Sequence, residues 1–320
     1  MISSVTDRAQ GTTDLNAPRT SLQFDLVAWS ARRLTAIEQA LSDWVASPDD
    51  TPAPAGLGDA MRYAVLDGGK RLRPLLVMAA CEAVDGNADA ALRSACAVEL
   101  IHAYSLVHDD MPCMDNDVLR RGKPTVHVQF GEAQAMLAGD AMQALAFEVL
   151  TPADGVVPPL LQARLCSLLS RAAGHAGMAG GQAIDLASIG KPLDEHALRD
   201  MHRRKTGALL QASVLMGAAC GATSPAAWQA LSEYGAALGL AFQVVDDVLD
   251  VTQESETLGK TAGKDVDSNK PTYVSVLGLT AAMQHARELR DKAHAALAHS
   301  GLADVTWLCT LADKVVERDS

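Results

Sequence analysis

The sequence predicts an all-α fold, and three observations carry that prediction. Hydrophobic residues make up 48% of the 320 residues and aromatic residues only 4%, so the apolar content is mostly Ala, Leu, Val and Met, which are largely good helix formers. Apolar residues recur at helical spacing along most of the chain. No run alternates with the period of two that a half-buried strand requires. Since no internal repeat divides the chain, we expect one all-α domain.

The expected elements follow from this periodicity and from Pro- and Gly-rich breaks. Residues 1–24 are polar and rich in Ser, Thr and Asn, so we expect a disordered tail there and a domain over 25–320. A first amphipathic helix is expected from Phe24 onward, before a loop at 47–58. Further helical patterns cover about 59–67, 72–84, 89–110, 131–149, 159–178, 195–220, 225–251, 271–299 and 302–317.

Charge and cysteine content narrow the class of protein. The formal net charge is -12 and the pI is near 5.1, which argues against a nucleic-acid partner. The six cysteines form no C-x-x-C pair and no signal peptide precedes them, which is typical of a reduced, cytoplasmic protein. No stretch approaches the roughly 18 apolar residues that span a bilayer, so we expect no membrane span.

Two aspartate clusters follow strongly apolar runs. The first reads HDDMPCMDND over 108–117, and the second reads QVVDDVLD over 243–250. Ionised carboxylates resist burial unless a positive charge compensates them, and hard oxygen ligands suit Mg²⁺. Pro112 should break the first helix and let Asp115 return toward Asp109. One such cluster alone could be a solvated acidic patch, but two favour a metal site. The candidate ligands are Asp109, Asp110, Asp115, Asp246, Asp247 and Asp250.

Basic residues gather in the same regions as the aspartates. They occur in GGKRLRP at 68–74, in RRGK at 120–123, in HRRKTG at 202–207, and more loosely at Lys260, Lys264 and Lys270. A single basic run is usually solvated surface. Cations beside metal-type carboxylates, in a protein that is acidic overall, instead indicate phosphoryl groups with several charges. With apolar helices behind them, a diphosphate head and an apolar tail are indicated, that is, a prenyl diphosphate.

Six motifs in order resemble one known family. GGKRLRP, DDMPCMDNDVLRRG, GGQAIDL, HRRKTGAL, FQVVDDVLD and LGKTAGKD…NKPTY resemble the trans-prenyl diphosphate synthases, and among them the bacterial farnesyl diphosphate synthases (geranyltranstransferases). The resemblance runs from about Phe24 to the C-terminus. It implies the isoprenoid synthase fold, a single-domain antiparallel helical bundle around a deep central cavity, usually as a homodimer. It also implies three Mg²⁺ ions, with Mn²⁺ as a possible substitute.

The resemblance also implies roles for single residues. Asp109 and Asp115 would hold two Mg²⁺ ions and Asp246 a third, with Asp247 and Asp250 in support. The allylic diphosphate would be bound by Arg120, Lys205 and Lys260. Isopentenyl diphosphate would be bound by Gly69, Lys70, Arg73, His102 and Arg121. The cavity between the substrates would be lined by Gln182, Asp185, Thr206 and Gln243.

The implied reaction joins isopentenyl diphosphate head to tail with dimethylallyl or geranyl diphosphate and gives farnesyl diphosphate. Mg²⁺-assisted ionisation, condensation and proton elimination are its steps. The residues expected to act directly are Asp109, Asp115, Asp246, Lys205 and Arg120. Tyr104 and Ser105 precede Asp109 by about one helical turn, so a bulky Tyr104 is placed to limit the growing chain. Tyr104 can equally be ordinary core.

Several alternatives share part of this pattern. A geranylgeranyl or geranyl diphosphate synthase would differ only in the pocket floor. A class I terpene cyclase would not need GGKRLRP or a second diphosphate site, and a non-catalytic partner subunit should lose metal aspartates. A His-Asp phosphohydrolase would need further spaced histidines besides His108. Asn116 departs from the Asp common in the family, and a weakly basic C-terminus leaves Arg318 outside the expected site.

Overall fold

The structure is a computed structural model that describes residues 19–46, 53–66, 68–191, 193–252 and 272–318. Within these residues the regular secondary structure consists of helices and one two-stranded hairpin, as expected for an all-α fold. The α-helices are α1 (Arg19–Trp44), α2 (Leu57–Val65), α3 (Leu72–Ala83), α4 (Ala88–Asp109), α5 (Val126–Phe130), α6 (Glu132–Leu150), α7 (Pro159–Ala173), α8 (Met178–Ala187), α9 (Glu195–His202), α10 (Ala208–Ala219), α11 (Pro225–Thr252), α14 (Tyr273–Leu277), α15 (Leu279–Ala298) and α16 (Thr306–Val316). A 3₁₀ turn (Pro54–Gly56), a π-helical turn (Arg203–Gly207) and the strands β1 (Leu119–Arg120) and β2 (Lys123–Pro124) complete them.

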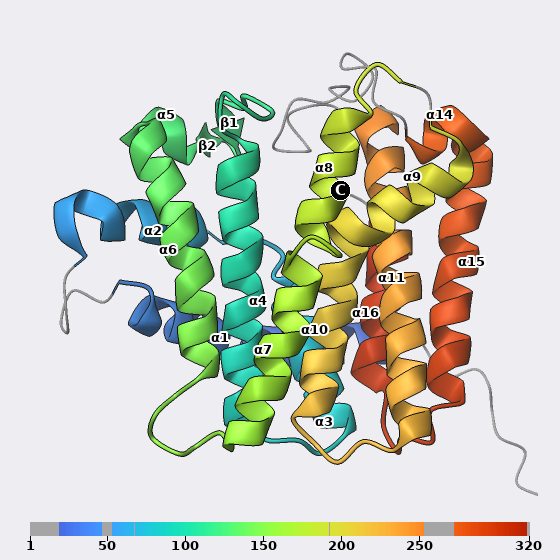
Figure 1. Cartoon of the computed structure of the whole chain (residues 1–320). Coiled ribbons are helices and arrows are strands. Elements are labelled where there is room, and N and C mark those ends of the chain that lie inside the picture. The colour runs from blue at the N-terminus through green and yellow to red at the C-terminus, as the bar shows by residue number, and fades with distance from the viewer. Residues whose placement is uncertain (1–18, 47–52, 67, 192, 253–271, 319–320) are drawn as a thin grey trace, which may run out of the picture.

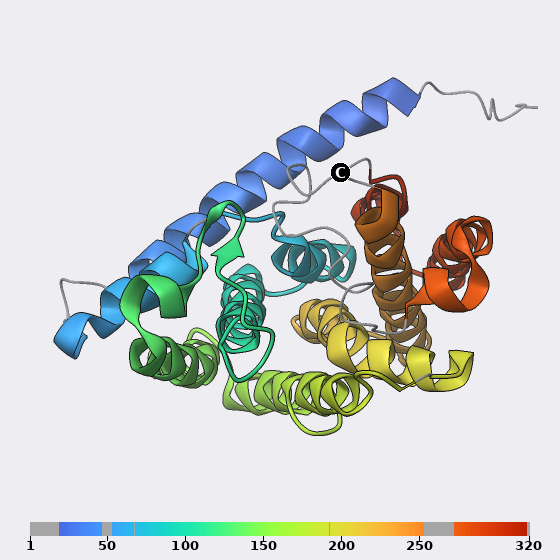
Figure 2. The same ribbon diagram turned by 90° about the horizontal axis from the view of Figure 1, so that it is seen from above.

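The long helices stand side by side as a bundle (Figure 1). α4 packs against α3 and α6, α10 packs against α3 and α11, and α11 packs against α15. Seen from above, α1 crosses one side of this bundle (Figure 2). α4 and α11 end at the same end of the molecule, so the residues at their C-terminal ends share that end (Figure 1). The first aspartate cluster lies at the C-terminal end of α4 and the second lies near the C-terminal end of α11, so both clusters lie at the same end of the bundle (Figure 1).

α4 combines an apolar composition with a central position. The expectation that no stretch approaches a bilayer-spanning apolar length is wrong for α4, which alone among the described helices is long and apolar enough to cross a bilayer, but 67% of its most apolar stretch is buried inside the protein. Its start is fixed by Asn87, whose side chain accepts a hydrogen bond from the Ala90 amide at 2.9 Å. Such burial is what the central helix of a bundle shows.

The first helix begins earlier than its apolar pattern indicates. α1 starts at Arg19, whereas the sequence predicts a tail up to residue 24 and a helix from Phe24. Once a helix has nucleated, each added residue gains a backbone hydrogen bond, so polar residues can extend it without an apolar face. Residues 1–18, which make up the rest of the predicted tail, lie outside the described residues.

The helix predicted over 159–178 is wrong beyond Ala173. α7 ends there, and a separate helix that the sequence does not predict, α8, begins at Met178. Two adjacent glycines lower the helix propensity of α8, which hides it from a pattern search. The glycine at 181 is required by packing, because a Cβ there would lie 2.1 Å from the backbone nitrogen of Lys205. α8 therefore lies directly against the π-helical turn.

A hairpin and a helix break were also not predicted. β1 and β2 pair antiparallel around Arg121 and Gly122, whose φ angles are 53° and 76°. Positive φ at both central residues is typical of a type I′ turn, and strands of two residues are too short to show alternation. The predicted helix over 271–299 is divided into α14 and α15 at Gly278, where φ is 81°.

A hydrogen bond between two side chains connects α15 to α16. His294 Nε2 lies 3.0 Å from Asp313 Oδ1, and this contact, followed by one with Cys309, raises the pKa of His294 to about 10. The folded-state pKa lies above the usual 6.5, so the protonated imidazole stabilises the fold. That stabilisation is fully present below pH 6.5 and is lost as the pH rises toward 10.

A His294→Asn variant is expected to be less stable than its parent at pH 6.5 and nearly equal to it at pH 10. Urea unfolding at several pH values measures the gap. Both proteins should carry Cys309→Ala, so that the gap reports the contact with Asp313 without the contribution of Cys309. A gap that stays constant between pH 6.5 and 10 would contradict the assignment.

Candidate active site

The first aspartate cluster folds back on the end of α4, as predicted from Pro112. The Asp115 amide donates to the Asp109 carbonyl at 2.9 Å, and the Asp117 amide donates to the Asp110 carbonyl at 3.1 Å. Asn116 has a φ of 51°, a left-handed conformation that Asn tolerates better than most residues. This turn places Asp115 beside Asp109 although six positions separate them in the sequence.

The carboxyl group of Asp109 lies in a site that disfavours its charge. Burial raises the pKa of Asp109 to about 6, nearby Lys205 opposes that rise, and Asp115 adds to it. A carboxylate in such a position gains from an added cation. Asp110, in contrast, is already held, because Arg120 donates to both of its oxygens at 2.8 and 2.5 Å. The bidentate pair assigns Asp110 to positioning Arg120 in this structure.

The second cluster also contains both a carboxylate that is held by neighbouring groups and one that is accessible. Asp247 is buried, and its oxygens accept from the Tyr273 amide at 2.8 Å and from Gln243 Nε2 at 2.9 Å. It therefore ties α11 to the start of α14. The Asp246 side chain is 38% exposed and contacts Arg318. Asp250 is buried one turn further along the helix. Asp246 is the accessible member of the three predicted metal ligands.

The π-helical turn connects both clusters. The charge of Lys205 acts to lower the pKa of Asp109, and the Lys205 Nζ donates a hydrogen bond to Asp185 on α8 at 2.6 Å. The next residue, Thr206, donates from its hydroxyl to Gln243 on α11 at 3.1 Å. A π turn inside a helix often marks a functional position, because one extra residue turns neighbouring side chains to a new direction. The structure thus brings Asp185, Lys205, Thr206 and Gln243, predicted from three separate motifs, to one place.

Several of the residues predicted to bind isopentenyl diphosphate gather around Arg121. Arg121 donates to the Gly68 carbonyl at 2.5 Å, and a Cβ on Gly69 would lie 2.9 Å from the Arg121 guanidinium. Burial, followed by the charges of Arg73 and Arg121, lowers the pKa of His102 well below its usual value. His102 is therefore a neutral side chain among cations, which can donate a hydrogen bond without adding charge.

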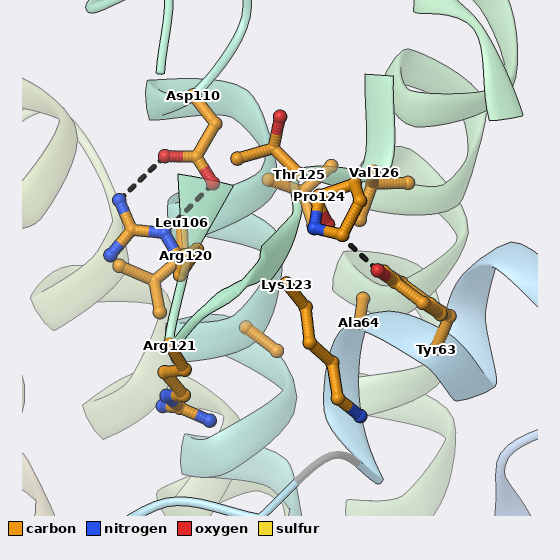
Figure 3. Close-up of a pocket in the computed structure, with 12 residues that line it drawn as sticks. Tyr63, Ala64, Leu106, Asp110, Arg120, Arg121, Lys123, Pro124, Thr125 and Val126 are labelled. Atoms are coloured by element: carbon orange, nitrogen blue, oxygen red, sulfur yellow. Dashed lines mark hydrogen bonds and ion pairs between the residues drawn. The ribbon is translucent and has the colours of Figure 1, made fainter. Parts of the chain in front are cut away.

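A pocket opens beside this cationic group, between α2, α4 and the hairpin (Figure 3). Arg120, Arg121 and Lys123 contribute its charged wall, and Tyr63 closes one side by donating to the Pro124 carbonyl at 2.8 Å. Its apolar wall comes from α2, from α4 and from the first residue of α5, with Ala64, Ala103, Leu106, Val107 and Val126. The pocket does not include Asp109 or Asp246, so it lies beside the paired clusters and not between them.

Two of the predicted substrate-binding residues have buried polar atoms without a hydrogen-bond partner among the described residues. Both amide atoms of Gln182 and the Nε of Arg73 are in this state. Both residues were predicted to contact substrate, and buried polar groups are rarely left unpaired in a protein without a ligand or water. Lys260, predicted to bind the allylic diphosphate, lies outside the described residues. Its place in the site stays a prediction.

Tyr104 and Ser105 occupy different faces of α4. Ser105 lies one turn before Asp109, and at 3.6 residues per turn Tyr104 lies about 140° round the helix from Asp109. The Tyr104 ring meets the His108 ring edge-on, with centroids 5.7 Å apart, and His108 contacts the Met136 carbonyl of α6 at 3.1 Å. Tyr104 therefore packs toward α6, while the smaller Ser105 follows the line of Asp109.

One site residue was missed by the sequence analysis. Arg318 follows α16 and contacts Asp246, with 3.1 Å between its Nη2 and the Asp246 Oδ1. The signal was a single basic residue near the end of the chain. Nothing in the sequence indicates that α16 returns to the end of α11, so the residue could not be placed from the sequence alone.

The residues present fit a divalent metal ion. The donors are carboxylate oxygens, which Mg²⁺ prefers, and burial raises the pKa of Asp109 more than nearby Lys205 and Arg120 lower it. No three His, Cys, Asp or Glu side chains in the described parts of the chain converge as a ready metal cage. That open arrangement suits Mg²⁺, which is usually bound by one or two carboxylates together with waters and substrate phosphates.

An all-helical bundle with two carboxylate clusters and separate cationic groups defines a metal-dependent enzyme class that acts on diphosphates. Residues 54–304 match the family model described as polyprenyl synthetase, and the chain belongs to that family. A relative from Arabidopsis thaliana, geranylgeranyl pyrophosphate synthase 12, chloroplastic, is 45% identical over 294 residues, 89% of this chain and 81% of the relative.

Two solved structures extend the comparison to the fold. An FPP/GFPP synthase from Zymomonas mobilis superposes with a TM-score of 0.80 at 40% identity, over 92% of this chain and 99% of that one. A geranyltransferase from Helicobacter pylori, complexed with magnesium and isoprenyl diphosphate, gives a TM-score of 0.79 at 32% identity, over 95% of this chain and 98% of that one. The fold is the isoprenoid synthase fold, as the motifs predicted.

Proposed function

We propose that the protein is a Mg²⁺-dependent prenyl diphosphate synthase that condenses isopentenyl diphosphate head to tail with an allylic diphosphate. The observation that carries this proposal is the pair of aspartate clusters, joined by the π-helical turn, with a second group of cations, Arg73 and Arg121, around the neutral His102. Two separate groups of cations match two diphosphate substrates. A terpene cyclase needs only one diphosphate site, so the second group favours condensation.

Different residues of the chain would bind each of the two substrates. Asp109, Asp115 and Asp246 would hold the metal ions, which when bound stabilise the negative charge of the departing diphosphate. Lys205 and Arg120 add fixed positive charge near the same group, and Asp185 and Asp110 hold them in place. Arg73, His102 and Arg121 would orient isopentenyl diphosphate. Apolar residues of α4 and α11 exclude water from the reacting carbon atoms.

Product length is the finer part of the proposal, and two products are candidates. The curated relatives, including the Arabidopsis enzyme, are named geranylgeranyl pyrophosphate synthases, which supports a twenty-carbon product better than the farnesyl product expected from the sequence. The bulky side chain at Tyr104 supports a fifteen-carbon product, and the name of the Zymomonas structure, FPP/GFPP synthase, includes farnesyl diphosphate as one of two products. The small Ser105 on the line of Asp109 leaves room for the longer chain.

Substitutions at these two positions test what limits the chain. If Tyr104 is the floor, Tyr104→Ala is expected to lengthen the product by at least one five-carbon unit, and Tyr104→Phe, which keeps the bulk, should leave it unchanged. If the tail instead follows Ser105, Ser105→Phe should shorten the product and Tyr104→Ala should not alter it. Mass spectrometry of the dephosphorylated products measures both. An unchanged product in both variants would exclude this part of α4 as the limit.

A homodimer in the cytoplasm completes the proposal. Exposed apolar side chains on α5, α6 and α7 support self-association, since Val128, Leu137 and Leu160 are 50%, 53% and 84% exposed. All six cysteines are free thiols, which is typical of a reducing compartment. Size-exclusion chromatography with light scattering tests the first point, and a monomer at micromolar concentration would contradict it.

A further inference from the structure

The end of α16 brings Arg318 onto the second aspartate cluster. Its Nη2 donates to Asp246 Oδ1 at 3.1 Å and to the Phe242 carbonyl at 3.2 Å. Its guanidinium carbon lies 4.2 Å from the centre of the Phe242 ring, and its Nε donates to the Val315 carbonyl at 3.1 Å. The side chain is only 10% exposed. The guanidinium is therefore held in one position over two successive turns of α11.

The contact involves the carboxylate that is most accessible to a metal ion. Asp246 is 38% exposed, while Asp247 is 3% exposed as a side chain and is bonded to Tyr273 and Gln243. Further cations face Asp246 from α3 and the loop before it. Burial, followed by the charge of Arg318, lowers the pKa of Lys70, and Asp246 has the opposite effect on Lys70. Asp246 thus belongs to a group of charges in which Arg318 is the direct partner.

We propose that Arg318 is a built-in counter-cation for Asp246 that competes with the metal ion for this carboxylate. The inference rests on the proposed function, because it takes Asp246 as a metal ligand. A divalent ion and a guanidinium on the same carboxylate repel each other, so each weakens the binding of the other. Because such coupling is reciprocal, metal bound at Asp246 must release the end of α16 by the same factor by which Arg318 weakens the metal.

This arrangement gives Arg318 a positioning role in the metal-free protein. It offsets part of the repulsion among Asp246, Asp247 and Asp250, which crowd one stretch of α11. It also fastens the end of the chain next to the site. When metal loads, the guanidinium loses its carboxylate but keeps the Phe242 ring and carbonyl as partners. The displaced side chain therefore stays close to the site and is not lost to solvent.

Metal binding by an Arg318→Met variant tests the proposal without any turnover. Mn²⁺ is titrated into the full chain without substrate, and binding is followed by the electron paramagnetic resonance signal of free Mn²⁺. Arg318→Met is expected to bind Mn²⁺ at least about 5-fold more tightly than the parent protein. Arg318→Lys keeps the charge but loses the planar fork, so its affinity should lie between the two. In an Asp246→Asn background the substitution should have no effect.

Lys314→Met is the matched control for loss of charge. Lys314 is an exposed cation one turn earlier on α16 whose charge also reaches Lys70, and its removal should change the Mn²⁺ affinity by less than about 2-fold, because solvent screens an exposed charge. A second readout is hydrogen exchange in the last turn of α16. Mn²⁺ should speed exchange there in the parent protein but not in Asp246→Asn.

The possible outcomes separate the inference from the proposed function. If the parent binds Mn²⁺ and Arg318→Met binds it equally or more weakly, the competition is refuted while the metal site stands. If Arg318→Met and Lys314→Met tighten binding equally, the effect is general charge, and the proposal also fails. If none of the variants binds Mn²⁺ and the parent makes no prenyl product, the proposed function fails, and this inference fails with it.

Discussion

An Asp109→Asn variant is expected to lose condensation activity by about 10³-fold or more, since it removes a metal ligand at the departing diphosphate. The same variant should be at least as stable as the parent in the absence of metal. Burial raises the pKa of Asp109 to about 6, so at pH 7 the folded protein holds a charge that its surroundings disfavour. A neutral amide removes that cost, by an amount on the order of 1 kcal/mol or more.

Steady-state kinetics at saturating Mg²⁺ and urea unfolding in EDTA measure the two effects. Asp140→Asn is the matched control. Asp140 is exposed on α6, and its substitution makes the same chemical change away from the site. It should alter activity by less than about 2-fold and stability by less than about 0.5 kcal/mol. An Asp109→Asn variant that keeps most of its activity, or that is clearly less stable without metal, would contradict the assignment.

An Arg71→Met variant is expected to lose about 3 to 5 kcal/mol of the free energy of unfolding. Arg71 is 4% exposed and donates to Glu38 at 2.7 Å, to Glu99 at 2.7 Å and to the Val65 carbonyl at 2.5 Å. It connects α1, α2 and α4 to the start of α3. Removing the guanidinium leaves the buried carboxylate of Glu99 without its partner, which is the costly way to break a buried ion pair.

Urea unfolding followed by circular dichroism measures this loss. Arg32→Met serves as the control, because Arg32 is an exposed residue of α1 and its change should stay within about 0.5 kcal/mol. A loss below about 1 kcal/mol for Arg71→Met would show that the pair is no more important than a surface ion pair. The GGKRLRP motif therefore contains a structural residue, Arg71, beside Lys70 and Arg73, for which binding of isopentenyl diphosphate stays a prediction.

The long helices could be predicted from the sequence because their apolar faces repeat over many turns. α3, α4 and α11 lie within a few residues of their predicted bounds, and the helix break at Pro112 correctly placed Asp115 beside Asp109. α8 and the hairpin could not be predicted in this way. α8 contains two glycines that only its packing against Lys205 explains, and β1 and β2 are too short for any periodic signal.

The contacts within the site depend on the fold and were only partly accessible from the sequence. Residue types and motifs predicted which side chains would gather, but not which carboxylates are engaged. Asp110 is bound by Arg120 and Asp247 by the Tyr273 amide, although their neighbours Asp109 and Asp246 have the same chemistry. Successive side chains on a helix point about 100° apart, so neighbouring aspartates meet different partners. Arg318 reaches Asp246 only because α16 packs back onto α11.

A condensation assay tests the central claim most directly. The protein is incubated with Mg²⁺, isopentenyl diphosphate and either dimethylallyl or geranyl diphosphate, and the prenyl chains are identified by mass, with EDTA and with isopentenyl diphosphate omitted as controls. The account predicts a linear product of fifteen or twenty carbons that requires both Mg²⁺ and isopentenyl diphosphate. A cyclic hydrocarbon formed without isopentenyl diphosphate, or no condensation with either starter, would contradict it.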